Sequence, residues 1–345
     1  MGTIIEKYKQ YRSRRWLRDT YKCKYALAGM GNHSIMNIYP VLQYLQVPVK
    51  YICCKSDDKL PLIENKYHGI KATASLDEIL DDNDIKGVFV SAFPRSHYSI
   101  SSKVLARGKS LFVEKPICYT SGELRELDCI AKRNGVKVAM VGMQKRYSPS
   151  GRLLQSRLKG SRLISYNYRY VTGLYPEGDV LVELFIHPLD YVTFLFGEAE
   201  IAGGKCVKSD NGGVTWLLVL QHENVAGVME LSSAYTWTDA QEALTVNTER
   251  GTYMLKQMEE LVFQAKPSAF CSIPIEKILP WNNSEKHLYE RNNFIPSLVN
   301  NQIYSQGYYN EIKAFLDVNE RNGDCISSMC DLFPTYGLIE KLRGI

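Results

Sequence analysis

The chain has 345 residues, of which 45% are hydrophobic and 23% charged, so it is long enough for two domains of ordinary globular composition. Its 42 Lys and Arg against 37 Asp and Glu leave a net charge of only +5, too small to indicate a nucleic-acid partner. Nine cysteines without a CxxC pair or a His cluster favour neither a disulfide framework nor a metal site.

The cysteine pattern fits a reducing, cytoplasmic setting. The N-terminus lacks the apolar stretch of a secretory signal, and no run reaches the about eighteen apolar residues that a membrane span requires. We therefore expect a soluble protein without a membrane partner.

Residues 6–18 form a basic stretch that carries three aromatic residues, Tyr8, Tyr11 and Trp16. Its cations are Lys7, Lys9, Arg12, Arg14, Arg15 and Arg18. One interpretation is an arm for nucleic acid or a membrane surface. We favour a solvated helix whose aromatic residues dock on the protein body or on a second subunit, because one short charge run usually makes only a solvated face. Residues 1–21 are thus predicted to be a basic extension.

A glycine turn follows the first apolar run. Residues 25–28 precede Gly29 and Gly31, and helically spaced apolar residues come next. Strand, turn and helix form the context of a dinucleotide fingerprint, in which the second glycine lets the backbone approach the pyrophosphate. Ser34 stands where a third Gly or Ala is expected, and its small side chain can be tolerated. Pro40 is predicted to kink the helix.

The second strand, residues 49–54, ends where an NAD-binding chain usually places an acid for the ribose hydroxyls. Lys55 and Ser56 stand there instead. A cation and a hydroxyl suit the 2′-phosphate of NADP, which we favour over NAD. Asp57 and Asp58 follow closely and keep NAD open, and a solvent-exposed turn is a further alternative.

Strands and helices alternate over about 120 residues, which indicates a parallel, doubly wound sheet. In such a sheet, ligands bind at the carboxyl ends of the strands. Pro94, His97 and Lys115 are predicted to fall at these ends. Because Lys115 precedes a proline, its backbone is held extended and projects the side chain from the strand end.

A helix is predicted over residues 180–195, with Asp179 as its N-cap. Along it Glu183, His187 and Asp190 are spaced i, i+4 and i+7, so they form one stripe on which a carboxylate can orient the imidazole. Pro188 is expected to remove the bond to Leu184 and bend the helix. A structural His with surface acids is the alternative.

The second half indicates an antiparallel platform. Its aromatic residues, including Tyr235 and Trp237, can stack on sugars, although packing in a core or an interface is the favoured use. Residues 266–301 are predicted to be a long loop that covers the site. The strands are predicted at 164–171, 214–220, 225–231 and 243–247, and helices at 309–319 and 334–342 end the chain.

Five motifs resemble the glucose-fructose oxidoreductase/inositol dehydrogenase (Gfo/Idh/MocA) family from about residue 22 to near the end. They are Gly29-x-Gly31-Asn32, Pro94-x-x-His97, Glu114-Lys115-Pro116 with Thr120, Gly142-x-x-x-Arg146-Tyr-x-Pro149, and Glu183-x-x-x-His187-x-x-Asp190. The resemblance implies a Rossmann domain, 22–145, then an α+β domain, 146–345, with an open, mostly antiparallel sheet. That sheet often mediates oligomerisation in the family, so we expect a homo-dimer or homo-tetramer.

The resemblance also implies the site residues. Lys115 and His187 take the catalytic positions, with Glu183 in place of the usual Asp, and Arg146 and Asp190 line the substrate region. Phe185 stands where the family usually has a small residue, which narrows the expected substrate pocket. With the residues noted above, the predicted cofactor-binding set is Gly29, Gly31, Asn32, His33, Lys55, Ser56, Pro94, His97, Glu114 and Lys115, in which Glu114 is a local structural anchor.

Hydride transfer from a carbinol needs a base near neutral pH and a cation beside the developing carbonyl oxygen, roles that suit His187 and Lys115. The favoured interpretation is an NAD(P)-dependent dehydrogenase or reductase of a sugar, a cyclitol or a sugar carried on a nucleotide. An NAD-dependent glycosidase of the same family shares these residues. A non-catalytic dinucleotide or sugar sensor is the third alternative, and retention of Lys115 and His187 argues against it.

Overall fold

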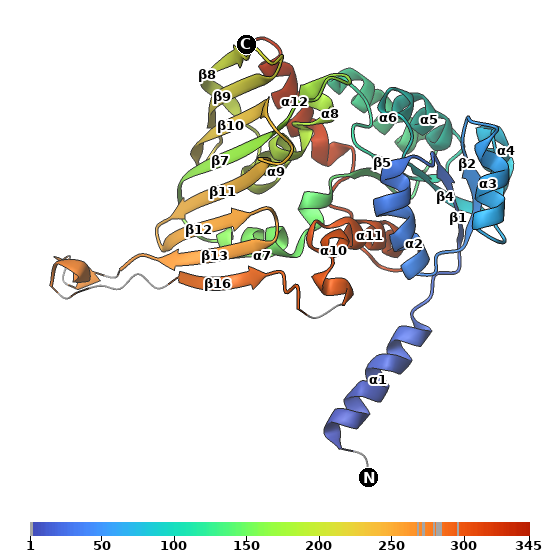
Figure 1. The fold of residues 1–345 in the computed structure, drawn as a ribbon, viewed down its shortest axis with the longest axis horizontal. Coiled ribbons are helices and arrows are strands. Elements are labelled where there is room, and N and C mark those ends of the chain that lie inside the picture. Colours follow the sequence, from blue (N-terminus) through green and yellow to red (C-terminus); the bar gives the residue numbers. More distant parts are fainter. Residues whose placement is uncertain (1–2, 268, 271–272, 279, 281–284, 295–296) are drawn as a thin grey trace. The chain divides into compact units, whose positions relative to one another are not determined.

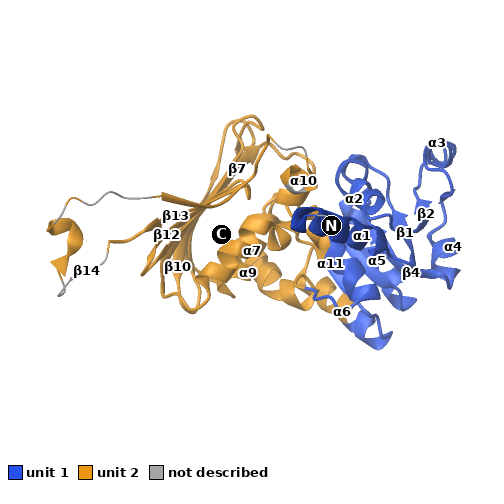
Figure 2. Cartoon of the chain, turned by 90° about the horizontal axis from the view of Figure 1, so that it is seen from below, with its two compact units in different colours: residues 1–114, 129–140, 312–325 blue, residues 115–128, 141–311, 326–345 orange. Residues whose placement is uncertain are grey.

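A computed structural model describes residues 3–267, 269–270, 273–278, 280, 285–294 and 297–345. The chain forms two compact units, coloured separately in Figure 2. Unit 1 comprises residues 1–114, 129–140 and 312–325, and unit 2 comprises 115–128, 141–311 and 326–345. The units interleave along the sequence, whereas the predicted domains are continuous, and the domain limits stay a prediction.

Unit 1 is built on a six-stranded sheet in the order β3-β2-β1-β4-β5-β6 (Figure 1). The neighbouring pairs from β3 to β5 are parallel, which confirms the predicted doubly wound sheet. The strand order reverses between β1 and β4, the point at which such sheets bind ligands. The strands are β1 Lys24–Ala28, β2 Val49–Cys53, β3 Lys71–Thr73, β4 Ile85–Val90, β5 Ser110–Glu114 and β6 Ala139–Gly142.

Aromatic side chains fill the core of unit 1. Phe315 lies 5.0 Å, ring centre to ring centre, from Phe89 and 5.8 Å from Phe112, and all three rings are fully buried. Burying each such ring stabilises the fold by about 1.5–3 kcal/mol. The helices are α1 Ile4–Arg18, α2 Tyr39–Tyr44, α3 Lys59–Lys66, α4 Leu76–Asp81 and α5 Pro94–Ala106, while α6 Ser121–Arg133 and α11 Tyr308–Glu320 contain residues of both units.

The helix after the glycine turn is irregular, as expected from Pro40. A π-helical turn, η1 Ser34–Ile38, precedes α2, and the N–H of Tyr39 donates to the carbonyl of Ser34, five residues back. Pro40 then lies in the first turn of α2, where its missing N–H costs least.

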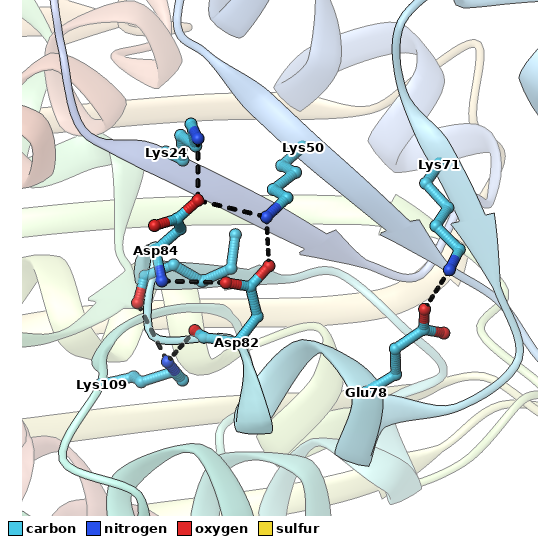
Figure 3. Close-up of polar contacts among 8 residues, drawn as sticks. Lys24, Lys50, Lys71, Glu78, Asp82, Asp84 and Lys109 are labelled. Carbon is cyan, nitrogen blue, oxygen red and sulfur yellow. Dashed lines mark hydrogen bonds and ion pairs between the residues drawn. The ribbon is translucent and has the colours of Figure 1, made fainter.

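Ion pairs join the amino ends of the strands of unit 1 (Figure 3). Lys24 contacts Asp84 at 2.8 Å, and Lys50 lies 2.5 Å from Asp82 and 3.3 Å from Asp84. The Nζ of Lys109 donates to the carbonyl of Asp82 at 2.8 Å, and burial lowers the pKa of this lysine. The segment before β4 is thereby tied to the starts of β1, β2 and β5.

Unit 2 contains an eight-stranded sheet in the order β16-β13-β12-β11-β7-β10-β9-β8. Every pair is antiparallel except β7 with β10, which confirms the predicted open, mostly antiparallel sheet. The four predicted strands correspond to β7, β9, β10 and β11. The bounds are β7 Leu163–Gly173, β8 Glu200–Lys208, β9 Val214–Gln221, β10 Ala226–Tyr235, β11 Gln241–Thr248, β12 Gly251–Lys256, β13 Glu260–Ala265 and β16 Glu285–Glu290.

The prediction of a long loop over 266–301 is wrong where the segment forms strands. β16 pairs antiparallel with β13 and forms the edge of the sheet. Its charged residues hid the strand, because edge strands carry charges where central strands carry apolar residues. The segment also contains β14 Ala269–Phe270, β15 Ile273–Pro274, η3 Ile275–Lys277 and η4 Leu298–Asn300, while Trp281, Asn282, Asn283, Ser284 and Pro296 lie outside the described residues.

Helices α7, α9 and α12 cover one face of this sheet (Figure 1). α11 and α12 confirm the two predicted C-terminal helices. The helical segments of unit 2 are η2 Gln144–Tyr147, α7 Pro149–Leu158, α8 Val180–Glu183, α9 Ile186–Phe196, α10 Gln302–Ser305, η5 Cys330–Leu332 and α12 Phe333–Leu342. Within the described ranges, no helix has the length and apolar character to cross a membrane.

Candidate functional site

The glycine turn at the end of β1 packs tightly on one side and is open on the other. Gly29 has a φ of +103°, and a Cβ there would lie 2.3 Å from the carbonyl oxygen of Ser91, after β4. A Cβ at Gly31 would have no atom within 4 Å. The first glycine therefore lets the turn approach β4, and the exposed backbone at Gly31 and Asn32 is accessible to a ligand.

Ser34 takes the place of the third glycine and adds a bond. Its buried Oγ donates to the carbonyl of Ser91 at 3.0 Å, which fastens the start of the helix to the end of β4. His33 lies beside it, with Nδ1 3.0 Å from the amide of Asn37 and Nε2 3.3 Å from a carboxylate oxygen of Glu114, at the end of β5. An amide that donates to Nδ1 leaves the proton on Nε2, which faces the carboxylate. Glu114 thus contacts the turn region, as expected of an anchor.

Lys55 and Ser56 follow the end of β2, as predicted, and both are exposed. Within the described part of the chain, Lys55 has no ion pair with an acid. The neighbouring Asp57 and Asp58 are exposed as well, and Asp58 precedes α3 without a side-chain capping bond. The carboxyl end of β2 therefore offers both a cation and acids to solvent.

Pro94 and His97 lie in the first turn of α5, after β4. Pro94 occupies the start of the helix, where its ring is compatible with the backbone. The His97 ring is buried, and its Nε2 lies 3.0 Å from the carbonyl oxygen of Ala92. This contact fixes the turn between β4 and α5 next to the residues that Gly29 approaches.

Lys115 directly follows β5 and belongs to unit 2. From Leu111 to Cys118 it is the only residue that is not buried. Its Nζ donates to the main-chain carbonyl of Glu183 at 2.5 Å. Residues far apart in the sequence thus meet, and the cation lies at the end of α8.

The side chain of Glu183 is buried and bonded to two phenols. The hydroxyl of Tyr119 donates to Oε1 at 2.6 Å, and that of Tyr175 donates to Oε2 at 2.9 Å. Burial, followed by the bond to Glu183, raises the pKa of Tyr175 to about 12, so its hydroxyl remains a donor at neutral pH. Gly178, with a φ of +114°, leaves room for the carboxylate, because a Cβ there would lie 2.3 Å from Oε1.

The predicted helix over 180–195 is wrong as a single element but begins and bends as expected. Asp179 accepts bonds from the N–H groups of Leu181 and Val182, which confirms the N-cap. The helix is interrupted between α8 and α9, at residues 184–185, because Pro188 has no N–H for the carbonyl of Leu184.

His187 lies in the first turn of α9, after this interruption. It is the only residue between Leu181 and Thr193 that is not buried, whereas the ring of Phe185 is fully buried, 6.2 Å from Tyr170 and 5.8 Å from Trp216. The proposed continuous stripe from Glu183 to His187 and Asp190 does not run along one helix. The imidazole is nevertheless presented within a run of buried residues.

Arg146 and Asp190 form a buried bidentate pair. Nε and Nη2 of the guanidinium donate to the two carboxylate oxygens at 2.8 and 2.6 Å. Arg146 also donates to the carbonyls of Ile326 and Asp331, and Thr335 donates to Asp190. The pair joins η2, α9 and the C-terminal segment, so both predicted substrate residues are engaged with the protein.

A second buried charge pair was not predicted. Lys145 is bonded to Glu242 of β11, and the hydroxyl of Tyr168 donates to the same carboxylate at 2.5 Å. Both charged side chains are nearly inaccessible to solvent. The only sequence signal was the position of Lys145 beside Arg146. Tyr119 and Tyr175, the partners of Glu183, were missed as well.

Metal chemistry has no candidate site among the described residues, since no group of three or more His, Cys, Asp or Glu side chains could hold an ion there. The arrangement can instead support proton transfer and charge stabilisation at Lys115 and His187. Both tasks depend on polar groups held at the surface of a buried framework.

Residues 23–143 match the family model described as "Oxidoreductase family, NAD-binding Rossmann fold". The chain is 27% identical over 158 residues to an uncharacterised oxidoreductase, YhhX, of Escherichia coli, covering 42% of this chain and 44% of that protein. It is 24% identical over 219 residues to the scyllo-inositol 2-dehydrogenase (NAD(+)) of Bacillus subtilis, covering 57% and 64%. The chain thus matches only about half the length of these curated relatives.

The fold extends over nearly the whole chain in a solved structure. A dehydrogenase from Chromobacterium violaceum superposes with a TM-score of 0.79 at 16% identity, covering 94% of this chain and 95% of that one. At this identity the likeness shows a shared fold.

Proposed function

We propose that the chain, whose residues 23–143 match the Gfo/Idh/MocA family model, is an NAD(P)-dependent oxidoreductase acting on a carbinol or carbonyl carbon. The observation that carries the proposal is the bond from Lys115 to the main-chain carbonyl of Glu183. This bond holds the partly exposed Lys115 cation at Glu183, the last residue of α8. Glu183 lies four residues before His187, which is also partly exposed. Two polar residues, each alone in a buried run, are thereby brought into one region of unit 2.

The glycine turn fits a dinucleotide. The open space at Gly31 admits a pyrophosphate close to the backbone, and the N–H groups that follow can donate to it. We assign the 2′-phosphate of NADP to Lys55 and Ser56, which are exposed at the end of β2. When bound, the cofactor supplies or accepts the hydride.

The residues of unit 2 then handle the proton and the charge. His187 accepts the hydroxyl proton when a carbinol is oxidised and returns it when a carbonyl is reduced. The Lys115 cation stabilises negative charge on the oxygen. Glu183 acts as a positioning residue, since its main-chain carbonyl holds Lys115 while Tyr119 and Tyr175 hold its side chain.

We propose a polyhydroxylated substrate, namely a sugar, a cyclitol or a sugar carried on a nucleotide. The proposal is supported by similarity to the inositol dehydrogenase of Bacillus subtilis. Such a substrate also meets the requirement of Lys115 and His187 for one oxygen on the reacting carbon.

We further propose that the uncovered face of the eight-stranded sheet joins copies of the chain. Val219 and Val228 lie directly opposite each other on β9 and β10, and both side chains are exposed. Leu217, two residues before Val219 on β9, is also exposed. Light scattering on the Val219→Glu/Val228→Glu protein should show a smaller assembly than the unmodified chain forms, and equal masses would contradict this interface.

The test of the proposed activity is turnover of a panel of sugars, cyclitols and sugar nucleotides by Lys115→Ala and His187→Asn proteins. We expect kcat to fall about 10³-fold for Lys115→Ala and about 10²- to 10⁴-fold for His187→Asn. Lys103→Ala, at an exposed position of α5, is the matched control and should retain full turnover. Thermal unfolding measured on each protein separates loss of chemistry from loss of the fold, and full activity of both site variants would refute the assignment.

Glu183 can be tested separately. Tyr119→Phe and Tyr175→Phe each remove one bond to the carboxylate. If Glu183 positions Lys115, both variants should lower kcat more than they change KM, and the double variant should lower kcat further. A change in thermal stability with unaltered kcat would mean that the two bonds are only structural.

A further inference from the structure

The net charge of the chain resides in its N-terminal helix. Residues 3–18 contain six basic residues and one acid, Glu6. Removing these from the 42 basic and 37 acidic residues of the chain leaves 36 of each. The small overall charge of +5 therefore conceals a strongly cationic α1 attached to a protein that is otherwise neutral.

α1 also contributes no side chain to a hydrophobic core. None of its residues is buried. Thr3 and Glu6 form a capping box, in which the N–H of Thr3 donates to the Glu6 carboxylate at 2.7 Å and the N–H of Glu6 donates to the Thr3 hydroxyl at 3.3 Å. Trp16 of α1 contacts the ring of Tyr44 in α2, at 5.2 Å between ring centres. The capped helix thus presents almost its whole surface to solvent.

The first half of α1 carries exposed apolar side chains. Ile4, Tyr8 and Tyr11 are spaced i, i+4 and i+7 and share one side, which Arg15 continues in the last turn, and Ile5 lies next to Ile4. Ile4 is 87% exposed and Ile5 65% exposed. Aliphatic side chains with this exposure are costly in water and gain free energy in an apolar phase.

The basic side chains of α1 are available to an anion. Among the described residues, none of the six has an ion pair with an acid. Lys7, Arg14 and Arg18 instead line a groove of about 770 Å³ together with Lys313 and Arg321. Asp19 is the only acid in the lining. Lys313 and Arg321 are paired with Asp317 and Asp19, whereas the α1 cations of this lining have no acid partner among the described residues and are open to an anion.

We propose that α1 binds the surface of an anionic phospholipid bilayer. Its aliphatic and aromatic side chains would enter the boundary between headgroups and acyl chains, and its cations would bind the headgroup phosphates. A nucleic acid fits less well, because it offers the phosphates but no apolar phase for Ile4 and Ile5. Pairing of two α1 helices from two copies would bring two strongly cationic surfaces together.

The test is co-sedimentation of the full chain with vesicles of phosphatidylcholine containing phosphatidylglycerol, compared with vesicles of pure phosphatidylcholine. We expect binding to the first and little to the second, with weakening at high salt. Lys9→Gln/Arg12→Gln/Arg15→Gln should weaken binding about 100-fold, or about fivefold for each cation removed. Ile4→Ser/Ile5→Ser should weaken it with the charge unchanged.

Lys103→Gln/Lys159→Gln/Lys208→Gln changes the net charge equally at exposed positions elsewhere and should bind vesicles like the unmodified protein. All three variants should keep their thermal stability and cofactor affinity. No residue of α1 is buried, and the three control positions are exposed. The proposal is overturned if anionic vesicles do not sediment the protein, or if the control loses as much binding as the α1 variants. Preference for single- or double-stranded nucleic acid over vesicles, or an α1-dependent dimer without lipid, would overturn it as well.

Discussion

The two edges of the parallel sheet in unit 1 use their polar groups differently. At the amino edge, lysines and aspartates bind one another, as in the contacts of Lys50 with Asp82 and Asp84 (Figure 3). At the carboxyl edge, Gly31 leaves open space and Lys55 is exposed without an acid partner in the described chain. One edge thus satisfies its charges internally, while the other keeps polar groups available for a ligand.

The largest expected effect is a loss of dinucleotide affinity when the open space at Gly31 is filled. A Gly31→Val side chain would meet no protein atom with its Cβ, so stability should be unchanged. Its methyl groups would fill the space proposed for the pyrophosphate, and dinucleotide affinity should fall about 10- to 100-fold. Titration of Trp fluorescence with NADPH measures the affinity, and urea unfolding measures the stability.

Gly29→Ala is the matched control, because its main effect should be on stability rather than on the space open to the dinucleotide. The positive φ and the approach to Ser91 should reduce the free energy of unfolding by about 1–3 kcal/mol. If Gly31→Val bound NADPH normally, the open space at the carboxyl edge would have no part in cofactor binding.

A smaller effect is expected at Lys55. Replacing a cation beside the 2′-phosphate by an acid, in Lys55→Glu, should weaken NADP binding about tenfold and leave NAD binding nearly unchanged. Lys59→Glu makes the same charge change at an exposed position of α3 and should have little effect. Equal losses for NADP and NAD would show that Lys55 does not contact the phosphate that distinguishes them.

The smallest effect is expected at the amino edge. The bond from Lys50 is the main cause that lowers the pKa of Asp82 from its usual 3.8 to about 2. A carboxylate with a lowered pKa stabilises the fold above pH 3.8, and this contribution is lost as the pH falls through about 2. Lys50→Ala should therefore lower the thermal midpoint slightly at neutral pH, and its difference from the unmodified protein should shrink between pH 4 and pH 2.

Cofactor affinity should not change in Lys50→Ala. Lys71→Ala, which removes a lysine whose ion pair in the described chain is with Glu78, should have a still smaller effect on the midpoint. A loss of NADPH binding in either variant would contradict the separation of the two edges.

Local patterns predicted much of the fold. The turn at Gly29 and Gly31, the N-cap at Asp179 and the interruption caused by Pro188 each depend on residues within a few positions of one another, so the sequence displays their causes. The strand β16 escaped prediction because its charged edge position is determined by its pairing with β13.

The candidate site was predictable only in part. Motif spacing indicated Lys115 and His187. In the structure Lys115 is bonded to Glu183, in the segment that precedes His187. Tyr119, one partner of Glu183, could not be predicted, because it lies 64 residues away. The same holds for Lys145 and Glu242, which are 97 residues apart. Such contacts arise from how the strands and helices pack, which no local pattern encodes.

The most direct measurement is to denature the freshly purified protein, identify any released NAD, NADP or reduced form, and titrate the remaining cofactor-free protein with each dinucleotide. We expect reversible, saturable binding with a preference for NADP. Binding of neither dinucleotide would contradict the assignment of the carboxyl edge as a cofactor site, and with it the proposed oxidoreductase activity.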